Sequence, residues 1–158
     1  MAIYGFGSVW DHEYKNEFFS NEKIIIGWDR IHAADLYSSV ASLKTGDVIY
    51  LKSNKPGSRT IRVKGIGIIT KNLINCIASG EYENTDINSW NSLFVRVKWI
   101  DCSEFSIIIP DDSGKLTNIR ASTMYEQHLP EVQDAILSHL LSHLNTPQNN
   151  SEGTPTTA

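Results

Sequence analysis

The chain is 158 residues long, carries a formal net charge of −4 at pH 7 and has an apolar fraction of 41%, which together predict one soluble globular domain with a core of its own. No stretch approaches the roughly 20 consecutive apolar residues of a membrane-spanning helix. No signal peptide is visible at the start, so we expect a cytoplasmic protein that does not contact a membrane. The two cysteines, Cys76 and Cys102, show no metal-binding or redox spacing, and we expect both to be reduced thiols.

The first part of the chain predicts two strands that alternate with two helices. Residues 3–10 are rich in aromatic and β-branched side chains and favour a strand. Asp11 is expected to cap a short helix that reaches residue 19. Residues 23–28 are a second strand-like apolar run, and apolar side chains at helical spacing predict a helix from about residue 29 to residue 43.

Residues 43–71 are the most informative stretch of the chain. Strand formers at 48–51, and alternating apolar and cationic side chains from residue 61, predict two strands separated by a loop that contains proline and glycine. Gly65 and Gly67 interrupt the second strand, which indicates a β-bulge or a close approach of another backbone.

Positive charge is concentrated in this part of an acidic chain. No Asp or Glu occurs from residue 48 to residue 80, whereas six cations do: Lys52, Lys55, Arg59, Arg62, Lys64 and Lys71. Such a zone is a candidate surface for binding phosphate. The alternative is a solvated strand face with a lysine-rich loop.

The last part of the chain predicts two further strands and a final helix. Residues 93–100 and 105–109 are expected to be strands, and residues 130–144 combine proline in the first turn with a wide apolar face, as in a helix. We expect one domain over residues 1–145 and a disordered polar tail over residues 146–158.

Residues 72–92 are expected to form an irregular excursion between two neighbouring strands. If the strand that follows them pairs with the strand at 61–69, four cations would share one face of the sheet and would gain from an anionic partner; these are Arg62, Lys64, Arg96 and Lys98.

Common catalytic motifs do not occur in the sequence, which has no P-loop, H-E-x-x-H, C-x-x-C or G-x-S-x-G. His139 and His143 lie four residues apart near the end of the last predicted helix, a spacing that suits a metal. Histidine at a helix C-terminus is also favoured by the helix dipole. We therefore expect no metal and no cofactor, and binding is favoured over catalysis.

Four tryptophans are many for a small domain. Trp99 alternates with the core face of its predicted strand, and Trp90 lies in the polar excursion. Trp10 and Trp28 lie at the ends of predicted strands, where they would line a pocket and could stack on a base. The structural alternative is that each is a core or rim residue.

The order of these segments resembles the PUA-like barrel domains of the EVE and YTH kind. YGFGSVWDHEYKNEFFSNEKIIIGW resembles their opening, and LKTGDVIYLKS closely resembles the EVE-like modules at the N-terminus of McrB-type restriction ATPases. Their later strands are similar to IRVKGIGIITKN and SLFVRVKWID in this chain, and their closing segment is similar to MYEQHLPEVQDAILSHLL. The resemblance covers roughly residues 3–144.

The resemblance implies an α+β fold, a PUA-like (EVE/YTH-type) partly open β-barrel of about five to six strands flanked by helices. Members of this kind read modified or flipped bases through an aromatic pocket. By position, the base-binding residues here would be Gly7, Ser8, Trp10, Trp28, Lys52 and Ser53. Phosphates would be held by Lys55, Arg59, Arg62 and Lys64.

The sequence therefore predicts a module that binds DNA or RNA and recognises a modified base, in a restriction or defence context. The effector, a nuclease or an ATPase, would be a separate protein. A first alternative is a sensor or interaction domain for a small nucleotide-like ligand, and a second is a small RNA-processing enzyme.

Overall fold

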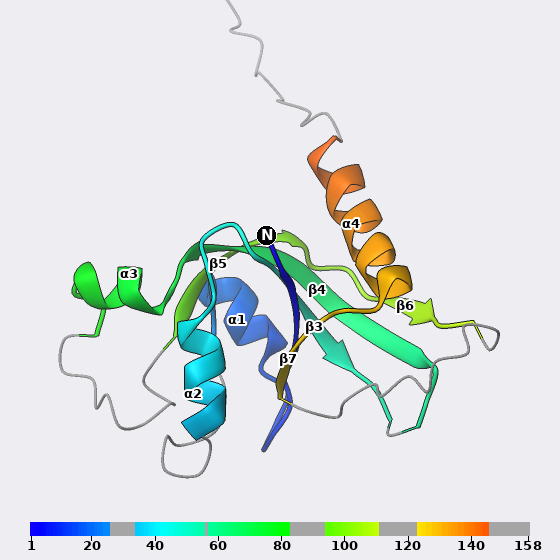
Figure 1. The fold of residues 1–158 in the computed structure, drawn as a ribbon, viewed down its shortest axis with the longest axis horizontal. Helices are drawn as coiled ribbons and strands as arrows, with labels where there is room; N and C mark the ends of the chain where they lie inside the picture. The colour runs from blue at the N-terminus through cyan, green and yellow to red at the C-terminus, as the bar shows by residue number, and fades with distance from the viewer. Residues whose placement is uncertain (26–33, 56, 83–93, 111–122, 146–158) are drawn as a thin grey trace, which may run out of the picture.

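The computed structural model describes residues 1–25, 34–55, 57–82, 94–110 and 123–145. The described chain is α+β, with a sheet that curls into a partly open barrel and helices on both of its sides (Figure 1). The described elements, in chain order, are β1 (Ile3–Gly7), α1 (Lys15–Asn21), β2 (Lys23–Ile24), α2 (Ala34–Ala41), β3 (Val48–Ser53), β4 (Thr60–Lys71), α3 (Leu73–Ala78), β5 (Val95–Asp101), β6 (Phe105–Ile108), β7 (Met124–Glu126) and α4 (Pro130–Leu144).

The sheet has seven described strands in the order β2-β5-β4-β3-β1-β7, with β6 paired to β4 beside this path. The expected α+β, partly open barrel is confirmed at this level, with more strands than the five or six expected. β1 and β3 are parallel, which requires a crossover, and the chain between them supplies it through α1, β2 and α2. The expected pairing of β4 with β5 is also confirmed.

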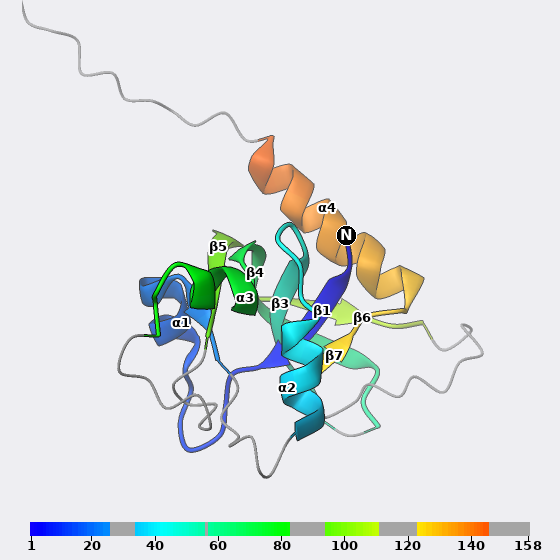
Figure 2. The same ribbon diagram turned by 60° about the vertical axis from the view of Figure 1, so that its left-hand side comes forward.

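Two apolar cores lie on the two faces of the sheet, and the helices are divided between these faces, with α4 on one side and α1, α2 and α3 on the other (Figures 1 and 2). Ile49 and Leu51 of β3 face the first core, to which α1, α2 and α3 also contribute; we call this side the inner face. Val48 and Tyr50 face the second core, which α4 covers; this is the outer face. Because both faces of β3 are buried, its sequence is a continuous apolar run rather than an alternating one.

A β-bulge in β4 changes which face its side chains occupy. Val63 and Ile66 both belong to the outer core although they are three residues apart, and the pairing of β4 with β3 shifts register at this point. Lys64 and Gly65 both face inward as a result. A Cβ on Gly65 would lie 2.7 Å from the ring of Phe19, so the glycine allows the close approach that the sequence predicted.

The prediction that Arg62, Lys64, Arg96 and Lys98 share one face of the sheet is wrong, because β4 contains this bulge. Arg62 and Lys64 face inward, before the switch. On β5, Val95 and Val97 belong to the inner core, so the alternating side chains Arg96 and Lys98 face the other way. The cations of the two strands therefore lie on opposite faces, because one extra residue reverses the alternation.

The first helix begins later than predicted. Residues 8–14 form a tight turn instead, in which Val9 and Glu13 make an isolated β-bridge and the Tyr14 amide donates to the Ser8 carbonyl at 2.8 Å. The N-cap is Tyr14 and has no side-chain cap. Asp11 does not cap the helix, because its carboxylate accepts hydrogen bonds from the Tyr14 hydroxyl and the His12 amide.

Part of the expected irregular excursion is helical. Residues 73–78 form α3, which begins with a capping box between Asn72 and Asn75. The short strand β7 was not predicted, and the final helix α4 was predicted within a residue at each end. Trp28, Trp90, the start of the second helix and the tail at 146–158 lie outside the described residues. Within the described ranges no helix is long and apolar enough to span a membrane.

Candidate functional site

A buried polar triangle lies on the inner face where β1 ends, and it consists of Ser8, Glu13 and Lys64. The Ser8 hydroxyl donates to Glu13 Oε1 at 2.5 Å, and Lys64 Nζ lies 2.5 Å from Glu13 Oε2 and 3.4 Å from Ser8 Oγ. Ser8 is 1% exposed and Lys64 is 6% exposed. The triangle therefore fixes the turn at residues 8–14 against β4.

Within the triangle, Lys64 and Glu13 form an ion pair. Burial alone would raise the pKa of Glu13, but hydrogen bonds from Lys64 and Ser8 outweigh it and lower the pKa. The carboxylate is thus ionised and neutralises Lys64. Lys64, predicted to hold phosphate, instead holds the turn.

An exposed aromatic surface is carried by this turn and consists of Trp10, His12 and Tyr14. The Trp10 and Tyr14 rings stack at 3.9 Å between centroids and 19° between planes, and the His12 ring lies 3.8 Å from the Tyr14 ring. Trp10 remains 36% exposed. A hydrogen bond to Glu17 raises the pKa of His12, which favours a positive charge on this surface.

Arg62 and Ser53 lie beside the triangle on the inner face. They are opposite each other in the register of β3 and β4, so their side chains share a face. Glu104, which follows β5, pairs with both Arg62 and Lys15. These two hydrogen-bonded cations lower the pKa of Glu104 to about 2. Arg62 and Lys15 therefore share one carboxylate within the protein.

Lys52 and Gly7 are neighbours in register, but the Lys52 side chain lies on the outer face. Its amine lies 4.9 Å above the Tyr125 ring and donates to Asn54 at 3.1 Å. Lys52 is 5% exposed, and burial lowers the pKa of its amine to about 8. The structure thus separates Lys52 from Ser8 and Trp10, with which the sequence grouped it.

The other predicted residues are spread more widely. Lys55 is exposed at the β3–β4 loop, and Arg59 donates to the Pro110 carbonyl at 2.9 Å. Trp28 lies outside the described residues. The structure therefore brings Ser8, Trp10 and Ser53 to one side of the sheet together with Arg62 and Lys64, which have carboxylate partners, and leaves Lys55 and Arg59 elsewhere.

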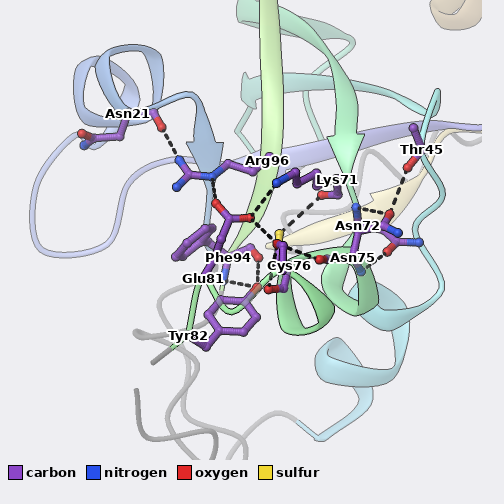
Figure 3. Close-up of polar contacts among 11 residues, drawn as sticks. Asn21, Thr45, Lys71, Asn72, Asn75, Cys76, Glu81, Tyr82, Phe94 and Arg96 are labelled. Carbon is purple, nitrogen blue, oxygen red and sulfur yellow. Dashed lines mark hydrogen bonds and ion pairs between the residues drawn. The ribbon is translucent and has the colours of Figure 1, made fainter. Parts of the chain in front are cut away.

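A second polar network lies at the opposite end of β4 (Figure 3). Glu81 Oε1 accepts from Arg96 Nε at 2.7 Å, and Glu81 Oε2 lies 3.6 Å from Lys71 Nζ. The Arg96 Nη1 group also donates to the Asn21 carbonyl at 2.9 Å. Beside this network is a hollow of about 380 Å³ lined by Glu22, Thr70, Lys71, Glu81, Arg96, Val97 and Lys98.

The carboxylates of these networks were missed from the sequence. Glu13 is 51 residues from Lys64, and Glu104 is 42 residues from Arg62, so no local spacing announces either pair. Glu81 follows a helix that was itself not predicted. Its only sequence signal is that it is the first acid after a long stretch without one.

The two histidines of α4 approach one carboxylate. His139 Nδ1 lies 3.8 Å from Asp101 Oδ2, and His143 Nε2 lies 3.6 Å from Asp101 Oδ1. Even so, across the described ranges no group of three or more His, Cys, Asp or Glu side chains is arranged to hold a metal ion.

No family model matches the sequence, and no curated protein matches it either. The site is therefore interpreted from its own geometry.

Proposed function

We propose that the protein is a non-catalytic, PUA-like binding module of the EVE kind that stacks a base of DNA or RNA on its aromatic surface. The observation that carries the proposal is the Trp10 ring, which is stacked on Tyr14 and still 36% exposed. An exposed ring held in a fixed plane suits base stacking, because every base presents a flat π-face.

The surroundings of Trp10 support this proposal in two ways. The buried triangle below the turn fixes the backbone that carries the ring, so little conformational entropy is lost when a base stacks. His12 beside it can donate a hydrogen bond or carry a positive charge. A methyl group on the base would add apolar contact with the rings, which favours a modified base as the ligand.

The direct test is a binding titration with fluorescently labelled oligonucleotides, single- and double-stranded, with unmodified or methylated bases. Wild type is compared with Trp10→Ala and Trp10→Phe, and with Ile74→Ala, which removes an exposed apolar side chain on α3. Loss of one stacked base costs about 1–3 kcal/mol, so Trp10→Ala should weaken binding by roughly 5- to 150-fold. Trp10→Phe should retain most of the affinity, and Ile74→Ala all of it.

Two results would contradict the proposal: equal binding by wild type and Trp10→Ala, or no binding to any oligonucleotide. Circular dichroism and thermal unfolding of each variant establish that it is folded.

A free nucleotide-like ligand is the second candidate. It is favoured by the pairing of Arg62 with Glu104 and of Lys64 with Glu13, which leaves less charge for a long phosphate backbone. Competition by a mononucleotide, with little dependence on salt, would select this candidate over nucleic acid.

A further inference from the structure

The hollow at the far end of β4 and the start of β5 is built from strand side chains and two carboxylates, those of Glu22 and Glu81. Lys71 and Arg96 are opposite each other in register, and Lys98 follows two positions along β5. Glu81 lies between the first two, since it accepts from Arg96 and pairs with Lys71 (Figure 3). Two of the three cations at the hollow are thus held by the same carboxylate.

The charges that line the hollow do not cancel. Three cations face two carboxylates. Burial would raise the pKa of Glu81, but the hydrogen bond and charge of Arg96 more than offset it, so the pKa is lowered and the group is ionised. Glu81 is shared between two cations, and Glu22 makes no ion pair among the described residues. The lining therefore carries one net positive charge, and its two charged groups without an ion pair among the described residues are Lys98 and Glu22.

Two groups at the hollow have unused hydrogen-bonding capacity. The Lys98 side chain makes no hydrogen bond or ion pair with the described residues, and it is exposed. The Arg96 guanidinium engages protein through Nε and Nη1, which leaves Nη2 without a partner in the described ranges. Thr70 adds a hydroxyl to the same wall.

We propose that this hollow binds a phosphate group. Lysine and arginine together supply a point charge and a planar donor fork, the combination that recognises the tetrahedral, multiply charged phosphate. At about 380 Å³ the hollow falls in the range of small-molecule sites. It has more space than a phosphate fills, so it also accepts the sugar attached to it.

This site is distinct from the aromatic surface and does not rest on the function proposed for it. The sequence placed phosphate on Lys55, Arg59, Arg62 and Lys64, whereas the structure pairs two of those cations with carboxylates and gives Lys98 no carboxylate partner in the part of the chain that it describes. The phosphate can belong to a free nucleotide or to a nucleic-acid backbone, and the experiment separates these sources.

The test uses the full chain labelled with ¹⁵N and titrated with inorganic phosphate at constant ionic strength. The backbone amides of Thr70, Lys71 and residues 96–98 should shift together and saturate. Lys98→Gln should weaken phosphate binding by roughly fivefold or more. Lys44→Gln is the matched control, since Lys44 is also exposed, loses the same charge and lies outside the hollow.

Three outcomes would overturn the proposal: shifts spread evenly over the surface, no saturation, or equal weakening in Lys98→Gln and Lys44→Gln. Binding of thymidine monophosphate is then compared with binding of a ten-nucleotide oligothymidylate, which identifies whether the phosphate belongs to a free nucleotide or to a nucleic-acid backbone. Tighter binding of the monophosphate indicates a free nucleotide, and tighter binding of the oligomer with a steeper salt dependence indicates nucleic acid. Phosphate binding that persists in Trp10→Ala separates this site from the aromatic surface, whichever way the base-stacking test turns out.

Discussion

The cations at the two ends of β4 differ in how they are paired with carboxylates. At the start of the strand, Lys64 pairs with Glu13, and Arg62 shares Glu104 with Lys15. At its end, Lys71 and Arg96 share the carboxylate of Glu81, and Lys98 has no carboxylate partner among the described residues. Cations that are close together in the sequence therefore do not all contribute positive potential to the same surface of the fold.

The difference follows from burial. Lys64 lies inside the fold, where an unpaired charge would cost several kcal/mol, so a partner is required. Lys98 is exposed, and water solvates its charge without one. Where the fold leaves cations in excess at a hollow, a ligand can supply the missing negative charge.

The largest effect is expected at Lys64. Lys64→Met removes the partner of the half-buried Glu13 carboxylate and should lower the free energy of unfolding by roughly 3–4 kcal/mol. Lys98→Met, at the open end, should change it by no more than about 0.5 kcal/mol. Urea denaturation at pH 7 measures both. Similar losses in the two variants would abolish the contrast between the ends.

Lys52 tests a third arrangement, in which the lysine is buried and its amine lies over an aromatic ring. The pKa of its amine falls from 10.5 in the unfolded chain to about 8 in the fold. Between these values the unfolded chain binds a proton that the folded chain lacks, so stability should rise as pH increases from 8 to 10.5, by roughly 2–3 kcal/mol. Lys52→Met should lack this rise when the two proteins are unfolded with urea across that range. A rise of equal size in the variant would rule out Lys52 as its source.

The capping box of α3 provides a further test at the end of β4 where Glu81 pairs with Lys71 and Arg96, because this helix precedes Glu81 in the chain. Asn72→Ala removes the side-chain cap and should destabilise the protein by roughly 1 kcal/mol. Asn72→Asp keeps an acceptor at the same place and should stay close to wild type in thermal unfolding. If Asp is as destabilising as Ala, capping is not the role of Asn72.

The smallest effect on stability at neutral pH is expected for Glu104→Gln, which lies near the surface. Because the pKa of Glu104 is lowered from 4.5 to about 2, its stabilising contribution is present above pH 4.5 and is lost as pH falls toward 2. The variant should lose less stability than wild type over that range. It should also free Arg62 and Lys15 for phosphate, and steepen the salt dependence of oligonucleotide binding by about 1–2 in log–log slope. An unchanged slope would place nucleic acid away from this end.

Periodicity in the sequence was sufficient for the main strands and for α4. The apolar run in β3 and the alternation in β5 depend on local burial, which a window of a few residues reveals. The glycines of β4 were interpreted correctly, since a Cβ on Gly67 would lie 2.5 Å from Val97 Cγ1. The side on which Lys64 emerges was not predictable, because a bulge is fixed by pairing with another strand.

The candidate site was only partly predictable for the same reason. Ser8 and Trp10 lie together because they are near in sequence, and a strand end was a sufficient signal. Lys52 was grouped with them by chain position, but the alternation of β3 sends its side chain through to the other face. The carboxylates that neutralise Arg62 and Lys64 come from distant segments, and only the fold brings them there.

Helix α1 has a consequence for any ligand that touches both sites. Two β5 side chains hold the last turn of the helix, as Trp99 Nε1 donates to the Phe18 carbonyl at 2.8 Å and Arg96 donates to that of Asn21. Its first residue directly follows the turn that carries Trp10. Seven residues of helix span about 10 Å, so α1 sets the distance between the end of that turn and the Arg96 side of the hollow. A ligand whose base and phosphate cannot span the separation of the two sites can engage only one of them.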